Sequence, residues 1–394
     1  MVTLKSILDN DFYKFTMQHA VIKLFPHAKV EYQFFDRGET KFPEGFSIEL
    51  KKSISRMAGL SLTPYEVSFL RERCRCLSPP YIDFLKGYRF DPDEVSMAQK
   101  RNKLTIQIKG YWYRAILWEV PVLSIVSELY FKMTGQKIIT VEEIIDGVKK
   151  KAAGYNAIDA RVVEFGTRRR YSFENQDVIL RELTKTGRPS FLGTSNLHFA
   201  MKYRLTPIGT HAHEWFMFHG AKYSCKMANS LALKNWADVY QGDLGIALSD
   251  TFTSEVFFRD FDKQFSKVFD GVRQDSGDPF AFADKAIAHY LGLDIEPNSK
   301  TIVFSDELNP VKVKKLVSHC KGKIKTVFGI GTNFTNDVGV CPLKIVIKMI
   351  KAKPEGDNWI SVVKLSDSSG KIIGDPDLIR MFENVLNVQN RKPG

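Results

Sequence analysis

The feature that most constrains the fold of this chain is a series of seven short apolar runs, most of which end in Gly, Ser, Thr, Asp or Arg. Between several of them lie segments with helical periodicity, such as residues 279–292 and 309–322, which both close with glycine. An alternation of strand, polar tip and helix indicates a parallel α/β fold. The runs are RVVEFGTRR, PSFLGTSN, TPIGTHAHEW, LGIALSDTF, VFDGVRQDSGD, TIVFSDELN and KTVFGIGTN.

Two architectures share this alternation. A doubly wound sheet concentrates function at one switch point, whereas a barrel of the TIM type places functional side chains at the end of nearly every strand. Nearly every run here ends in side chains suited to chemistry or to phosphate binding, which favours an irregular TIM-like barrel. The segment LWEVPVL, residues 117–123, is the candidate for an irregular eighth strand.

The rest of the chain predicts an additional α+β domain. Residues 30–38 alternate like a strand, residues 63–74 have helical spacing after a capping threonine, and residues 103–123 hold strand-like runs. A helix is expected over residues 121–135, with proline early and glycine at its end. We therefore divide the chain into an N-terminal α+β domain (1–115), the barrel with the active site (116–345) and a C-terminal extension (346–394). The extension is expected to form a hairpin and a helix that pack on the N-terminal domain.

Composition narrows the class of protein. The chain has 394 residues, five cysteines and a net charge of +12. It holds neither an apolar run long enough to span a membrane nor an apolar signal segment, so we expect a cytoplasmic protein with reduced, buried thiols. The positive charge suits a nucleic-acid binder or an enzyme that handles several phosphates. The absence of a zinc-finger, basic-zipper or RNA-binding signature favours the enzyme.

The stretch IGTHAHEW, residues 208–215, carries two histidines two positions apart. On a strand, His211 and His213 would point to one face and could share a metal ion. Such a site needs further ligands at later strand ends, but the later histidines fall on predicted helices, so we expect no direct metal ligands. An imidazole can instead take a phosphoryl group on nitrogen. We expect His211 and His219 to fill structural positions.

Other strand ends supply charged groups and a glycine-rich turn. The guanidinium groups of GTRRR suit phosphate or carboxylate, and the arginine and carboxylates of RQDSGDP suit sugar hydroxyls, or magnesium through water. The FGIGTN turn is placed like the backbone phosphate cradle that follows the last strands of a barrel. The residues concerned are Arg168, Arg169, Arg170, Arg273, Asp275, Asp278, Asp306, Gly329, Gly331 and Thr332.

Taken in order, the motifs DNDFYKFTM, EFGTRRR, GTSN, GTHAHEW, VRQDSGDP and FGIGTN resemble those of the nicotinate phosphoribosyltransferase family. The resemblance extends from Asp9 to about Gly374. It implies an enzyme that joins nicotinate to phosphoribosyl diphosphate, giving nicotinate mononucleotide and diphosphate in NAD salvage. It also implies a ligase-type coupling to ATP hydrolysis through a phosphohistidine, with Mg²⁺ held by the substrate phosphates rather than by tight protein ligands.

The same resemblance implies roles for individual residues. His213 is the expected phosphohistidine, because it holds the last position of the G-T-x-A-H motif, and Thr210 is expected near nicotinate. Phe165 and Tyr13 are expected to sandwich the pyridine ring, with Tyr13 supplied by the neighbouring subunit of a homodimer. The remaining expectations are Arg168 and Arg273 at the phosphate or carboxylate, Asp275 and Asp306 near ribose and magnesium, and Gly329, Gly331 and Thr332 at the 5-phosphate. Arg169 and Arg170 receive no individual role.

Ser195 bears on the choice of base. Relatives that use nicotinamide carry Asp after the G-T of this motif, whereas this chain has GTSN. A carboxylate would repel the carboxylate of nicotinate, and a hydroxyl can donate a hydrogen bond to it. Serine therefore favours the acid. The same-class alternative is a nicotinamide- or quinolinate-using transferase, and the alternative from another class is a basic nucleic-acid-binding protein on a degenerate barrel.

Overall fold

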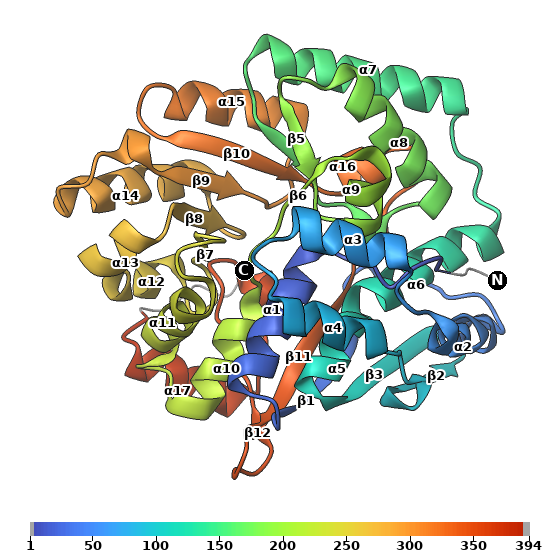
Figure 1. Ribbon diagram of the computed structural model, residues 1–394, viewed down its shortest axis with the longest axis horizontal. Helices are drawn as coiled ribbons and strands as arrows, with labels where there is room; N and C mark the ends of the chain where they lie inside the picture. The colour runs from blue at the N-terminus through green and yellow to red at the C-terminus, as the bar shows by residue number, and fades with distance from the viewer. Residues whose placement is uncertain (1–3, 389–394) are drawn as a thin grey trace.

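The computed structural model describes residues 4–388, and its core is a curled parallel sheet of seven strands (Figure 1). Each predicted run contains one of these strands, which confirms the predicted alternation. The strands are β4 (Val162–Glu164), β5 (Phe191–Thr194), β6 (Thr206–Pro207), β7 (Ile246–Leu248), β8 (Gly271–Gln274), β9 (Thr301–Phe304) and β10 (Lys325–Ile330). Their order is β6-β5-β4-β10-β9-β8-β7, and neighbouring strands run parallel.

Helices connect the parallel strands, and α7, α8, α14 and α15 surround the sheet in Figure 1. Local sequence explains where they begin. Asp278 and Asn309 cap α14 and α15, and a proline follows each cap. Asp278 is thus a helix cap rather than a ligand of the site. The helices are α7 (Val141–Ala157), α8 (Phe173–Thr186), α9 (Leu197–Tyr203), α10 (His213–Tyr223), α11 (Ala228–Tyr240), α12 (Ser254–Asp260), α13 (Lys263–Val268), α14 (Pro279–Gly292), α15 (Pro310–Cys320) and α16 (Thr332–Thr335).

The predicted eighth strand at residues 117–123 is wrong. These residues form the end of a 3-10 turn and the start of α6 (Glu119–Thr134). All seven are buried, and a continuous apolar run does not by itself distinguish a buried helix from a buried strand. Within residues 4–388 the sheet therefore ends at β6 and β7, as a half-barrel.

Side chains bridge the open edge between β6 and β7. The hydroxyl of Thr210 donates to the carbonyl of Ile246 at 3.1 Å, and the amide of Leu248 donates to His211 Nε2 at 3.1 Å. The segment that carries His213 is thus attached to β7 by two side chains in place of a strand ladder.

A second sheet is antiparallel and has the order β12-β11-β1-β3-β2. Its strands are β1 (Lys29–Asp36), β2 (Val95–Lys100), β3 (Lys103–Tyr111), β11 (Ile345–Lys353) and β12 (Ile360–Ser361). In Figure 1 the orange-red β11 lies beside the early strands, and its register pairs Lys353 with Lys29. β11, at the start of the C-terminal extension, therefore lies in the sheet of the N-terminal part, whereas the helix predicted to pack there lies on the half-barrel, with the ring centroids of Phe382 and Phe252 5.8 Å apart.

The helices of the N-terminal part follow the predicted signals. Thr63 and Glu66 form a capping box at the start of α3, and Gly135 adopts the left-handed conformation after α6. α1 is buried on most sides, including the polar side chains of Lys14 and Gln18. The remaining helices are α1 (Phe12–Leu24), α2 (Phe46–Arg56), α3 (Pro64–Arg73), α4 (Pro79–Gly87) and α5 (Trp112–Ala115).

After β12 the chain returns to the half-barrel before it forms α17 (Pro376–Val385). The amide of Leu365 donates to the carbonyl of Thr251 at 2.8 Å, and the amide of Gly277 donates to Ser368 Oγ at 3.1 Å. The predicted terminal helix is confirmed. Residues 364–371 therefore lie against the strand ends that follow β7 and β8.

Within residues 4–388 no helix combines the length and the apolar character needed to cross a bilayer. The five cysteines are free, as predicted, but Cys341 is exposed and Cys76 is half-buried.

Candidate functional site

Two adjoining cavities lie at the carboxyl ends of the parallel strands. The larger has a volume of about 200 Å³ and the smaller of about 80 Å³. Tyr13, Arg168 and Arg273 line both cavities, so the two spaces share a wall. Parallel α/β folds bind their ligands at this end of the strands.

The smaller cavity gathers the residues that were predicted around the base. Its apolar lining includes Ile208, Ile246 and Val303. The predicted residues that line it are Tyr13, Phe165, Arg168, Ser195, Thr210 and Arg273. A small space with two aromatic side chains and two guanidinium groups can hold a flat, anionic ring.

Phe165 follows β4, and its ring lies against Gly329 of β10. A Cβ atom at position 329 would stand 2.4 Å from a ring carbon of Phe165. Any side chain there would displace the ring, so glycine is needed for this close approach. Gly329 serves the aromatic wall, and neither it nor Gly331 or Thr332 lines either cavity. Their contact with a 5-phosphate stays a prediction.

Tyr13 reaches the smaller cavity from α1 of the same chain. A Cβ atom at Gly209 would lie 2.9 Å from the backbone nitrogen of Tyr13. The amide of Phe12 donates to the carbonyl of Ser195 at 2.7 Å. These contacts seat the chain's own tyrosine at the cavity, which corrects the expectation that a neighbouring subunit supplies it.

Asp11 is a member of the smaller cavity that the sequence did not reveal. The hydroxyl of Ser195 donates to Asp11 Oδ1 at 2.8 Å. Burial raises the pKa of Asp11, against Arg168 and the hydroxyls of Ser195 and Thr167, which favour the ionised form. The hydroxyl group of Ser195 therefore already donates its hydrogen bond to Asp11, so Ser195 affects binding of the base through Asp11.

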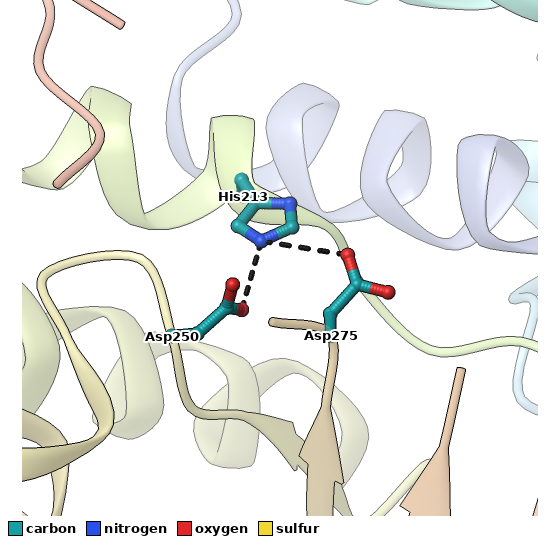
Figure 2. A group of neighbouring side chains, drawn as sticks. All are labelled: His213, Asp250 and Asp275. Carbon is teal, nitrogen blue, oxygen red and sulfur yellow. Dashed lines mark hydrogen bonds and ion pairs between the residues drawn. The ribbon is translucent and has the colours of Figure 1, made fainter. Parts of the chain in front are cut away.

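His213 lies in the first turn of α10, which corrects its predicted place on a strand. Its Nε2 is 2.9 Å from Asp250 Oδ1 and 3.7 Å from Asp275 Oδ2. Figure 2 shows both contacts leaving the same ring nitrogen, while Nδ1 points away from the carboxylates. Because His213 lines the larger cavity, Nδ1 is the ring atom left for a ligand.

The surroundings of His213 keep its ring neutral. Burial and the ammonium group of Lys364 lower the pKa of His213 to about 4, although Asp250 opposes them. Burial alone would raise the pKa of Asp250, but His213 and Lys364 hold it well below its usual value. At pH 7 the ring therefore donates its Nε2 proton to an ionised carboxylate and keeps a lone pair on Nδ1. A neutral imidazole oriented in this way is suited to nucleophilic attack.

Asp275 and Asp306 both line the larger cavity. Asp275 Oδ1 accepts hydrogen bonds from Arg273 at 2.9 Å and from Ser305 at 2.6 Å. Burial would raise the pKa of Asp275, but Arg273 and His213 lower it below its usual range. The structure thus brings these two predicted carboxylates and Arg273 together around one space.

Two lysines of the C-terminal extension complete this charge arrangement, and sequence reasoning missed both. Lys364 Nζ lies 3.5 Å from Asp250 Oδ2. Lys371 Nζ donates to the carbonyl of Asp275 at 2.8 Å and also pairs with Asp306. No strand-end pattern marks these lysines, because they approach the strand ends from a segment far along the chain.

His213, Asp250 and Asp275 could in principle hold a metal ion, since one ligand atom of each lies within 4.8 Å of the others. However, Lys364 already stands beside Asp250, and Arg273 beside Asp275. An added divalent ion would be repelled by both cations. The donor set does not fit a tightly held metal, and carboxylates that face the cavity suit Mg²⁺ bound to a phosphate ligand instead.

The three consecutive arginines have different environments. Arg168 and Arg169 line the larger cavity, together with Arg37 and Lys348. Burial lowers the pKa of Lys348 to about 8. Arg170 instead turns inward, where its guanidinium forms two hydrogen bonds of 2.8 Å with Asp9. Only the first two arginines of GTRRR can therefore reach an anionic ligand.

His211 and His219 are structural, as expected. His211 is fully buried, and burial together with Arg273 lowers its pKa to about 3. His219 Nδ1 lies 2.7 Å from the carbonyl of Trp215, and its Nε2 lies 2.9 Å from Asn235 Nδ2. Neither histidine lines a cavity of the site.

Replacing His211 with leucine should reduce the free energy of unfolding. The amide of Leu248 would lose the His211 nitrogen that accepts its hydrogen bond at the open edge of the sheet, and it would remain buried. An unsatisfied buried donor costs about 1–3 kcal/mol. Urea unfolding of the wild type and of His211→Leu measures the difference; an unchanged midpoint would show that this hydrogen bond does not stabilise the edge.

Two models of one protein family together match most of the chain. The model described as the nicotinate phosphoribosyltransferase (NAPRTase) family matches residues 160–390, and that of its N-terminal domain matches residues 8–127. A nicotinate phosphoribosyltransferase of Chromohalobacter salexigens is 53% identical over 98% of this chain and 100% of its own length. The crystal structure of nicotinate phosphoribosyltransferase from Porphyromonas gingivalis superposes with a TM-score of 0.95 at 44% identity, covering 98% of this chain and 100% of that one. The crystal structure of nicotinate phosphoribosyltransferase from Vibrio cholerae superposes with a TM-score of 0.92 at 32% identity, covering 99% of this chain and 95% of that one.

Proposed function

Because this chain belongs to the nicotinate phosphoribosyltransferase family, we propose that it transfers the phosphoribosyl group of phosphoribosyl diphosphate to nicotinate. The observation that carries the proposal is the wall shared by the aromatic cavity and the larger charged cavity. A pyridine ring in the first and a sugar diphosphate in the second would meet there, with the ring nitrogen facing the ribosyl carbon. The products are nicotinate mononucleotide, a precursor for NAD biosynthesis, and diphosphate.

The smaller cavity supports an acid rather than an amide as the base. Tyr13 and Phe165 offer aromatic faces to the pyridine ring, and Arg168 offers a guanidinium group to its carboxylate. Asp11 would repel that carboxylate if it were free. Ser195 donates a hydrogen bond to Asp11, and the positive charge of Arg168 offsets part of the repulsion between Asp11 and the ligand.

The larger cavity supports cleavage of the bond between ribose and diphosphate. As that bond breaks, positive charge develops on the sugar and negative charge on the leaving group. Asp275 and Asp306 would face the sugar, and the cations of the cavity would face the diphosphate. Mg²⁺ bound to the diphosphate oxygens would neutralise part of the leaving-group charge. The cations are Arg37, Arg169, Lys348, Lys364 and Lys371.

Coupling to ATP follows from the state of His213. Its Nδ1 lone pair would attack the γ-phosphorus of ATP, ADP would leave, and the Nε2 proton would remain hydrogen-bonded to Asp250. The ionised Asp250 stabilises the positive charge that the ring acquires. Hydrolysis of this phosphohistidine during the cycle would give the ligase-type coupling.

We also propose that the protein is a cytoplasmic homodimer in which each chain uses its own Tyr13. Gly331 and Thr332 would lie near the 5-phosphate.

The base is the first test of the proposal. Nicotinate, nicotinamide and quinolinate are supplied in turn with phosphoribosyl diphosphate, Mg²⁺ and ATP, and mononucleotide formation is measured. We expect kcat/KM for nicotinate to exceed that for nicotinamide by roughly 10²-fold or more, because the amide cannot pair ionically with Arg168. Equal or better use of either other base would overturn the assignment of nicotinate.

Arg168 provides the matched variant for this test. In Arg168→Met, the preference for nicotinate over nicotinamide should fall, since the cation that distinguishes them is gone. A variant that keeps the full preference would move carboxylate recognition to another group, such as Arg273.

A further inference from the structure

Five buried polar side chains lie beneath the smaller cavity without lining it, and no ligand contact explains them. Each has at most 1% of its surface exposed, and none lines either cavity. Four of them occur in the motifs DNDFYKFTM, EFGTRRR and GTSN. They are Asp9, Thr167, Arg170, Gln176 and Asn196.

These side chains form one hydrogen-bonded network. Asn196 Nδ2 donates to Asp9 Oδ1 at 2.8 Å and lies 3.2 Å from Thr167 Oγ1. Gln176 Nε2 donates to the same hydroxyl oxygen at 3.1 Å, and its Oε1 accepts from Arg170 at 3.1 Å. The bidentate pair of Arg170 and Asp9 closes the circuit. Buried polar networks of this kind rigidify the segments that they join.

The joined segments are those that form the walls of the base cavity. Residues 9–13 carry Asp11 and Tyr13, and residues 165–170 carry Phe165 and Arg168. Residues 194–196 carry Ser195, which bonds to Asp11. Thr167 joins two of these segments, because it lies in residues 165–170 and its oxygen accepts hydrogen bonds from Asn196, at the end of β5, and from Gln176.

We propose that Thr167 is a positioning residue for the base cavity, which holds the N-terminal segment and the ends of β4 and β5 in register around nicotinate. The inference rests on the proposed function for its ligand. Thr167 lines neither cavity, and it acts through the two amide side chains that donate to it.

Valine at position 167 is a sharp test because it has nearly the shape of threonine and lacks the hydroxyl. Each donor would keep another acceptor: Gln176 Nε2 lies 3.2 Å from Glu164 Oε1, and Asn196 Nδ2 keeps Asp9. The substitution therefore removes the hydrogen bonds that tie Asn196 and Gln176 to residues 165–170, and it leaves one N–H of each amide group without an acceptor. We therefore expect weaker binding of nicotinate, with little change in the binding of phosphoribosyl diphosphate.

In Thr167→Val the KM for nicotinate should rise about tenfold, a change of ~1.4 kcal/mol, while the KM for phosphoribosyl diphosphate changes less than about threefold. Thr167→Ser restores the hydroxyl and should recover most of the nicotinate KM. Thr184→Val is the matched control, because the Thr184 hydroxyl donates only within α8, to the carbonyl of Leu180 at 2.7 Å. Unchanged KM values in Thr167→Val, or an equal rise in both, would overturn the proposal.

Hydrogen exchange of the substrate-free protein gives a measurement that does not depend on the reaction. The amide of Phe12 donates to Ser195 O, and the amide of Leu197 donates to Asn10 O at 3.1 Å. Thr167→Val should speed exchange in residues 8–13 and 195–198 and leave the β1–β11 ladder unchanged. Exchange unaltered in those two segments, or faster everywhere, would contradict a positioning role. If the wild type fails to use nicotinate, the proposed function falls, whereas this exchange result still decides the role of Thr167.

Discussion

Replacing His213 with alanine should reduce ATP hydrolysis during the transfer by roughly 10³-fold or more, while some uncoupled formation of nicotinate mononucleotide persists. The variant loses the Nδ1 lone pair, and losses of this size follow removal of a nucleophile that forms a covalent intermediate. The aromatic cavity and the cations remain in place, so binding and positioning still support transfer. ADP release and mononucleotide formation, measured in the same reaction, give the ratio that decides the matter. Tight coupling that survives in His213→Ala would exclude a phosphohistidine at this position.

His211→Gln is the matched control, since it removes the neighbouring imidazole, which lies outside the cavities, and supplies a side-chain oxygen that can accept from the amide of Leu248. Mass spectrometry after exposure to ATP should find a phosphoryl group on residue 213 in both the wild type and His211→Gln. The pH dependence adds a second check. With the pKa of His213 lowered to about 4, the ring stays neutral from pH 7 down to about 5, and coupled hydrolysis should fall only as the pH approaches 4. Loss of coupling near pH 6.5 would show that the ring is not shielded as the structure indicates.

Replacing Lys14 with methionine should lower the free energy of unfolding by about 3–5 kcal/mol, the usual effect of removing one partner from a buried ion pair. The Lys14 side chain is fully buried and pairs with both Glu119 and Glu214. Tyr32 also donates to Glu214. Methionine keeps most of the volume but leaves the buried Glu214 without its cation, while Glu119 keeps Arg168 at 3.4 Å. Urea unfolding followed by circular dichroism measures the change.

Lys234→Met is the control for the loss of a lysine, because Lys234 forms an exposed i,i+4 pair with Asp238. Such pairs contribute at most about 1 kcal/mol. Adding Glu214→Gln to Lys14→Met should recover part of the lost stability by removing one uncompensated charge. The deficit of Lys14→Met should also be smaller at pH 5 than at pH 8. Without Lys14 the folded pKa of the carboxylates rises, and groups with raised pKa values favour the folded state at low pH. Equal destabilisation by the two lysine variants would refute the account.

The sequence predicted those elements of the fold whose signals lie within a short stretch of the chain. The seven parallel strands could be found because each short apolar run ends in a polar tip and is followed by a helical pattern. The strand predicted at residues 117–123 is wrong because α6 is buried on nearly all sides at its start and therefore shows no amphipathic period. His213 was placed on a strand for a related reason, since β6 contains only two residues and the chain enters α10 soon afterwards.

The candidate site was predicted where one motif supplies one wall. Phe165, Arg168, Ser195 and Thr210 follow strands whose ends must converge in a parallel sheet. Asp250 also follows a strand, in LSDTF, so its position is a signal of the same kind. Lys364 and Lys371 could not have been found in this way, because their place depends on how the C-terminal extension folds back over the half-barrel.

The pairing of β11 with β1 has a consequence for how the protein is made. A ribosome releases β1, β2 and β3 early, and these can pair at once, but the other edge of β1 stays open until β11 has been synthesised. An unpaired edge can recruit strands of other chains, and a partner so distant in sequence also slows folding. The half-barrel is therefore synthesised while this edge is still unpaired. Lys364 and Lys371 follow β11, so the segment that pairs with the edge of β1 precedes the last charged residues of the site. A prematurely terminated chain would therefore expose an unpaired strand edge, which favours aggregation, and would lack both lysines.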